Sequence, residues 1–173
     1  MKHLPIIAGT IFIVFTFLGA AMAEPFAALV DIPAELEKEK SGFMSDVSAA
    51  QNSKGRIPSR EEVGIPAYPG AKILFVQLEN RMQENGAWID LPKRIFMGTP
   101  DTSQQVVEFY KKNLIGWEYG EFYKIPTFYK KEGEFKPMED MITPRIVIAP
   151  EFRPRAIMPL SKTTIDIYYS RDQ

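Results

Sequence analysis

The sequence of 173 residues contains no cysteine and only one histidine, His3. The absence of thiols excludes disulfide bonds, thiolate metal sites and a lipid anchor attached through cysteine. Long apolar runs are also rare, because only residues 4–18 form one. Any folded domain must therefore derive its stability from an ordinary apolar core.

The apolar run follows Lys2 directly and ends shortly before Ala21 and Ala23, which place small residues where a signal peptidase reads them. This pattern predicts that residues 1–23 are a secretory signal peptide, cleaved between Ala23 and Glu24. The mature protein is then expected in the periplasm or outside the cell. The alternative is an inner-membrane anchor through residues 4–23, which just reach the roughly 20 residues that span a bilayer.

Cleavage would remove Lys2 and His3, so the 21 basic residues of the full chain would become 20, against 22 acidic ones. This balance lacks the basic surplus that nucleic acids attract, and we expect no nucleic acid partner. A mature chain without histidine or cysteine also excludes His-based catalytic triads and zinc, copper or haem sites built on imidazole or thiolate. No cofactor is expected.

Residues 24–63 contain few large apolar side chains and include a mixed-charge run from Glu35 to Lys40. Pro33 before this run and Gly42 after it predict one short helix, followed by a flexible linker. The turn residues Pro69 and Gly70 mark the start of a folded domain. We expect a single α+β domain over residues 64–173.

One helix is predicted in this domain, over residues 102–115. Asp101 is the expected N-cap, with Gln104 three residues later in a capping-box arrangement, and Gly116 ends the helix. Apolar side chains recur at three- and four-residue spacing, at Val106, Val107, Phe109, Tyr110 and Leu114. Such an amphipathic helix is expected to pack one face on a sheet.

Segments rich in aromatic and β-branched residues predict strands at 72–78, 88–91, 94–98, 119–124, 127–131, 145–149 and 163–169. Asn85-Gly86 predicts a turn, and Pro92 predicts an interruption between two extended pieces. Strict alternation from 163 to 169 predicts an antiparallel sheet with one wet face. The expected fold is α+β, a curved antiparallel sheet with one main helix packed on one face.

Residues 117–136 combine many aromatic rings with lysines. Rings beside cations can stack on sugars or hold a peptide, but alternate rings of a hairpin can equally face the core. Alternation predicts that Phe128 points inward and its neighbour outward. The candidate partner-binding surface consists of Tyr123, Lys124, Tyr129, Lys130 and Lys131.

Acidic residues also gather in this part of the chain, at Glu132, Glu134, Glu139 and Asp140. Two carboxylates can hydrolyse glycosides when a cleft holds them roughly 5 to 9.5 Å apart, but solvated charge in a loop is the favoured interpretation. The sequence therefore predicts a non-enzymatic binding or structural module for a protein, glycan or lipid of the envelope. The alternative is a metal-independent hydrolase or lyase that uses carboxylate, lysine or tyrosine chemistry.

Three stretches carry a resemblance to a known group of proteins. They are an IPxYPGAK turn at residues 65–72, a VVxFY helix segment at 106–110 and an LxGW end at 114–117. This pattern resembles small exported bacterial proteins of uncharacterised function. The resemblance implies export and an α+β fold, and it brings no catalytic residue, ligand or activity.

The intact mass of protein recovered from producing cells tests the predicted export. Cleavage after Ala23 should yield a chain that begins at Glu24, because signal peptidase accepts small side chains at the two positions that Ala21 and Ala23 occupy. A recovered mass that still includes residues 1–23 would identify this segment as a membrane anchor.

Overall fold

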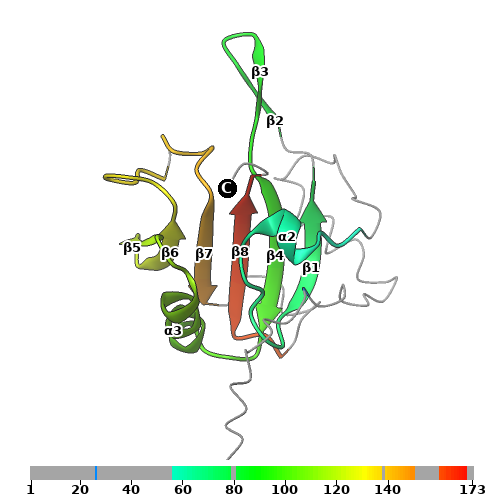
Figure 1. Ribbon diagram of the computed structural model, residues 1–173, viewed down its shortest axis with the longest axis vertical. Helices are drawn as coiled ribbons and strands as arrows, with labels where there is room; N and C mark the ends of the chain where they lie inside the picture. The colour runs from blue at the N-terminus through cyan, green and yellow to red at the C-terminus, as the bar shows by residue number, and fades with distance from the viewer. Residues whose placement is uncertain (1–25, 27–55, 79–80, 138, 151–159, 171–173) are drawn as a thin grey trace, which may run out of the picture.

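The computed structural model describes residues 26, 56–78, 81–137, 139–150 and 160–170 (Figure 1). Its elements in chain order are α2 Arg60–Val63, β1 Lys72–Gln77, β2 Arg81–Glu84, β3 Ala87–Asp90, β4 Lys93–Thr99, α3 Ser103–Asn113, β5 Glu118–Phe122, β6 Ile125–Tyr129, β7 Arg145–Pro150 and β8 Thr163–Tyr169. The expected cleavage site at Ala21 and Ala23 and the expected helix at 35–40 lie outside the described residues.

A six-stranded antiparallel sheet organises the fold, with strand order β1-β4-β8-β7-β6-β5. The strands β5 to β8 form a meander, and β8 then pairs with β4, which pairs with β1. The predicted α+β fold with a mainly antiparallel sheet is thus confirmed. The edges of the sheet are β1 and β5.

The strands β2 and β3 form a separate two-stranded sheet that extends beyond the main sheet as an arm (Figure 1). The arm continues the register of β1 and β4. Gln77 pairs with Arg94 at the end of the main sheet, and Arg81 pairs with Asp90 in the arm. Pro92 lies between the two parts and has no N–H to donate to a ladder. One long hairpin is therefore divided near Pro92 into a sheet part and an arm.

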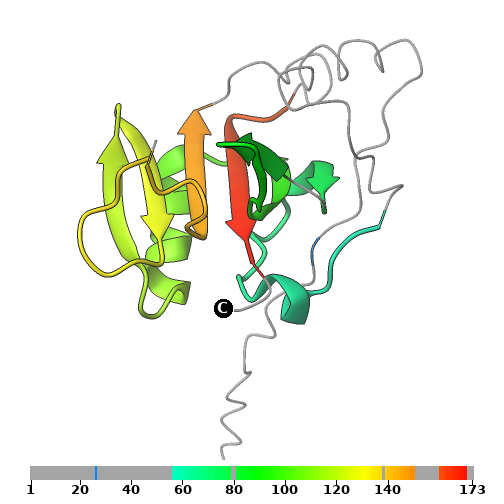
Figure 2. The same ribbon diagram turned by 90° about the horizontal axis from the view of Figure 1, so that it is seen from above.

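The apolar core lies between one face of the sheet and a layer made of α3, α2 and residues 64–71 (Figures 1 and 2). The helix α3 contributes Val106, Val107 and Tyr110, as its spacing predicted. The sheet contributes fully buried side chains from its central strands, at Ile95, Met97, Ile146, Ile148, Ile165 and Ile167. No helix in the described ranges has the length and apolar character needed to cross a membrane.

The helix α3 begins one residue later than predicted. Thr102 is the N-cap, and it forms a capping box in which its hydroxyl accepts from the backbone of Gln105 and its backbone N–H donates to Oε1 of Gln105. Asp101 instead accepts a hydrogen bond of 2.7 Å from the hydroxyl of Tyr68. The carboxylate that the sequence assigned to the helix therefore fastens residues 64–71 to the start of α3.

Residues 60–63, which the sequence analysis assigned to the linker, form the helical turn α2. The hydroxyl of Ser59 accepts from the backbone of Glu62, and Gly64 ends the turn with a φ of 67°. Val63 is fully buried in the core. A helix of this length is too short to produce an apolar periodicity, so the sequence pattern could not reveal it.

The second face of the sheet, which we name the outer face, is not the wet face that alternation predicted. Thr164 and Asp166 of β8 point to it and are only 4% and 8% exposed. Beside them, the rings of Phe75 and Phe96 stack with centroids 5.3 Å apart. The outer face is covered because large side chains from neighbouring strands pack on one another.

Removing the hydroxyl group from each of two buried tyrosines should change the free energy of unfolding in opposite directions. The hydroxyl of Tyr110 is buried without a partner among the described residues, so Tyr110→Phe should raise the free energy of unfolding by about 1 kcal/mol. Tyr68→Phe removes a hydrogen bond to a carboxylate and should lower it by about 1.5 kcal/mol or more. Urea denaturation measures both, and destabilisation by Tyr110→Phe would show that its hydroxyl has a partner.

Candidate functional site

One row of side chains on the outer face crosses all six strands of the sheet. Its members are paired across successive strand boundaries, in the order Gln77, Arg94, Tyr168, Arg145, Tyr129 and Glu118. Directly opposite side chains lie close enough to interact. We call this set the outer row.

Arg94 is held in the outer row by a carboxylate from the neighbouring strand. Its Nε and Nη2 donate to Oδ1 and Oδ2 of Asp166 at 2.6 and 2.5 Å, and the hydroxyl of Tyr168 donates to Oδ2 at 3.0 Å. Burial alone would lower the pKa of Arg94, but the charge and hydrogen bonds of Asp166 raise it overall. Arg94 thus engages both carboxylate oxygens of Asp166, and this bidentate pair joins β4 to β8.

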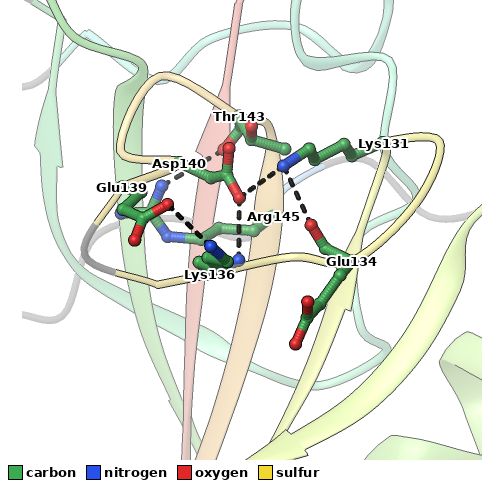
Figure 3. A network of polar contacts seen from close by, with 7 residues as sticks. All are labelled: Lys131, Glu134, Lys136, Glu139, Asp140, Thr143 and Arg145. Atoms are coloured by element: carbon green, nitrogen blue, oxygen red, sulfur yellow. Dashed lines mark hydrogen bonds and ion pairs between the residues drawn. The ribbon is translucent and has the colours of Figure 1, made fainter.

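Arg145 approaches the same tyrosine from the other side. Its guanidinium carbon lies 3.9 Å from the ring centroid of Tyr168, and its Nη1 donates to the carbonyls of Met141 and Thr143 at 2.9 and 3.1 Å. Burial lowers the pKa of Arg145, although the side chain of Tyr168 favours the charged form. Arg145 thereby fastens the loop before β7 to the sheet (Figure 3).

The loop that connects β6 to β7 is held together by Asp140. Its Oδ2 accepts from Lys131 Nζ at 2.6 Å and from the backbone N–H of Lys136 at 2.7 Å (Figure 3). The hydrogen bond from Lys131 is the main cause that lowers the pKa of Asp140. A further bond, from the backbone of Lys130 to the carbonyl of Pro144, closes the loop at its base. It is a compact loop of the Ω type.

Tyr129 lies on the opposite face from the buried Phe128, as alternation predicted. Its ring stacks on Phe135 with centroids 4.7 Å apart and lies 6.0 Å from the ring of Phe122. Phe135 is itself buried and belongs to the β6–β7 loop. Tyr129 is therefore half-buried packing beneath that loop and presents little free surface.

The other candidate residues do not form one surface either. Lys131 is engaged by Asp140, whereas Lys130 is exposed at the C-terminal end of β6. Tyr123 and Lys124 form the two-residue turn between β5 and β6, at the far end of that strand. A strand of β6's length separates the two places by about 16 Å, at 3.3 Å per residue. We name Tyr123 and Lys124 the hairpin tip.

The hairpin tip has an unusual backbone for its residue types. Tyr123 and Lys124 have φ values of 53° and 64°, both in the left-handed region. The turn of the arm has the same character, with φ values of 49° and 83°, but it uses Asn85 and Gly86, which suit it. A non-glycine residue held in this region costs on the order of 1 kcal/mol or more. Tyr123 is also 90% exposed.

The acidic residues of the β6–β7 loop have structural surroundings. Asp140 organises the loop, Glu139 pairs with Lys136, and Glu132 and Glu134 are exposed. Within the described ranges, no three acidic or histidine side chains are grouped as a metal site would require. Glu132 and Glu134 thus lie exposed on the loop, whereas Asp140 holds the loop together.

Sequence reasoning missed the cluster of Arg94, Arg145, Asp166 and Tyr168. Arg94 and Asp166 are separated by 72 positions, and only the pairing of β4 with β8 brings them together. The available signal was Asp166 itself, a carboxylate between Ile165 and Ile167 in a strand whose other residues carry no charge. Such a residue requires a partner when both faces of the sheet are covered.

A scan against protein-family models gave no match, and neither did searches of curated proteins and of solved structures. The resemblance to small exported bacterial proteins therefore stays a prediction.

The buried and the exposed arginine pairs provide a matched test. Arg94→Met leaves the carboxylate of Asp166 buried without its cation and should lower the free energy of unfolding by about 3–5 kcal/mol. Arg81→Met breaks an exposed pair with Asp90 and should cost less than about 1 kcal/mol. Urea denaturation compares them. Equal, small costs would mean that Asp166 is solvated and that the outer row contributes little.

Proposed function

We propose that this chain is an exported protein of the bacterial envelope that acts as a non-enzymatic binding module through its hairpin tip. The observation that carries the proposal is the exposed aromatic residue Tyr123 in a left-handed turn. Strained backbone clusters at functional sites, and tyrosine is enriched at protein interfaces.

No ring contact or hydrogen bond of Tyr123 among the described residues offsets the backbone strain at the hairpin tip. Tyr123 makes no ring contact or hydrogen bond with another described residue, and Lys124 is exposed beside it. The same protein builds a turn of the same kind from Asn85 and Gly86 at lower cost. A partner that contacts Tyr123 and Lys124 explains why residues that are strained at positive φ occupy this turn.

The chemistry of the hairpin tip suits contact with another molecule. A tyrosine ring supplies a large apolar area with few rotatable bonds and a hydroxyl that hydrogen-bonds at the rim of an interface. The neighbouring lysine adds a positive charge. By contrast, Asp166 already accepts hydrogen bonds from Arg94 and Tyr168, which leaves this carboxylate a structural role.

Export is supported by the N-terminal pattern, namely Lys2, the apolar run over residues 4–18, and the small residues Ala21 and Ala23. In the envelope, the hairpin tip would meet periplasmic or extracellular partners. A stable domain without thiols suits that environment, because no disulfide must form for it to fold.

Exchanging the hairpin tip for the turn sequence of the arm tests the proposal. The double variant Tyr123→Asn, Lys124→Gly should raise the free energy of unfolding by about 1–2 kcal/mol, because both residues then tolerate positive φ. The same variant should lose the partner that wild-type mature protein captures from crosslinked envelope extract.

The control is Trp88→Ala, which removes another exposed ring, 68% accessible, from the separate β2–β3 arm. This variant should retain both stability and capture. Retained capture by the hairpin-tip variant would refute the proposed contact, and a loss of stability would show that the turn is not strained.

A further inference from the structure

We infer that β5 accepts an extended, basic segment of a partner protein as an additional strand of the sheet. This inference rests on the proposed function and defines how the partner binds beside the hairpin tip. Strand addition to an open sheet edge is a common mode of peptide recognition, in which backbone hydrogen bonds supply affinity and side chains supply specificity.

The two edges of the sheet differ in how well they are protected. β1 is buried from Ile73 to Gln77, and its register shifts between Ile73 and Phe75, as at a β-bulge. β5 pairs regularly with β6 over its whole length and exposes Glu118, Tyr119 and Glu121. Among the described residues β5 has no bulge, proline or covering segment, and its charged side chains are the protection that it carries against pairing with a like-charged edge.

The register of the β5–β6 hairpin identifies the backbone groups that face outward. Phe122 and Ile125 flank the two-residue turn and form a hydrogen-bonded pair, and such pairs alternate along an antiparallel ladder. Phe122, Gly120 and Glu118 therefore bond to β6. The N–H and C=O groups of Tyr119 and Glu121 point away from the sheet, where an added strand can pair with them.

Charge selects the sequence of the added strand. Glu118 and Glu121 have no ion-pair partner in the described part of the chain, and the hydroxyl of Tyr119 positions Glu121 through a hydrogen bond of 2.8 Å. The two glutamates are three residues apart and so point to opposite faces. An added strand complements both when it carries two basic residues at the same spacing, one for each face.

The hairpin tip lies in continuation of this edge. Tyr123 directly follows Phe122, the last residue of β5. A segment paired along β5 and extended beyond it therefore reaches the exposed ring of Tyr123. The edge and the tip together form one elongated site, whose backbone part is β5 and whose aromatic part is Tyr123.

A defined peptide tests the inference without knowledge of the natural partner. The probe is acetyl-Thr-Lys-Val-Thr-Lys-Val-Thr-amide, in which the lysines are three apart. The matched control is acetyl-Thr-Val-Lys-Thr-Lys-Val-Thr-amide, which has the same composition but places both lysines on one face. A second control is the probe with every amide N-methylated, which keeps the charges but cannot donate backbone hydrogen bonds.

Amide NMR of labelled mature protein reports the binding. The probe should shift the amide signals of β5 and slow hydrogen exchange at Tyr119 and Glu121, because their outward N–H groups become paired. The control with both lysines on one face should bind about threefold to fivefold more weakly, since one charge pair is lost. The methylated probe should not bind.

Charge reversal in the protein provides the second arm. Glu118→Lys with Glu121→Lys should weaken the probe about tenfold and create binding of the peptide in which both lysines are glutamates. Glu61→Lys with Glu84→Lys, an equal charge change at two exposed positions in α2 and the arm, should leave probe binding unchanged.

The outcomes separate this inference from the proposed function. Signal changes confined to Tyr123 and Lys124, or equal binding of the methylated probe, would refute strand addition while leaving the hairpin tip as the contact. Sedimentation that shows dimers, abolished by the Glu118 and Glu121 reversals, would mean that a second copy occupies the edge. No binding of any peptide at millimolar concentration would also overturn the inference.

Discussion

The pairing of β8 with both β4 and β7 is the constraint on which the rest of the structure depends. This register places Ile165 and Ile167 in the core and Asp166 and Tyr168 on the outer face. A shift by one residue would exchange these two sets and bury a carboxylate among isoleucines. The bidentate bond between Arg94 and Asp166 forms only in the observed register, so the outer face helps to specify the core.

The outer row connects the pairing of β8 to the edge of the sheet at β5. Arg145 stacks on Tyr168 and holds the β6–β7 loop, and the loop places Phe135 on Tyr129. The most lysine-rich and aromatic part of the sequence is therefore largely committed to packing. Among the described residues, the parts of this region that remain exposed are the edge strand β5 and the turn that follows it. The proposed contact surface is therefore the part of this region that packing leaves exposed.

The sequence predicted those features that one segment determines alone. The strand from 163 to 169 and the alternation of Phe128 and Tyr129 agree with the structure, because period-two patterns report directly on strand faces. The N-cap was misplaced because Asp101 and Thr102 are both good caps, and Tyr68, which is distant in sequence, engages Asp101. The burial of the outer face escaped prediction, since polar residues alternating along a strand resemble a solvated face until their partners are known.

The acidic side chains of β5 disfavour pairing of this open edge with the same edge of a second copy. Two β5 strands paired with each other would bring four carboxylates, from Glu118 and Glu121 of each copy, into adjacent strands without a cation between them. Like charges in neighbouring strands oppose such pairing, and this is one way in which proteins keep edges from joining. The same charges attract a basic strand, so repulsion between copies and selection of a partner arise from one pair of side chains.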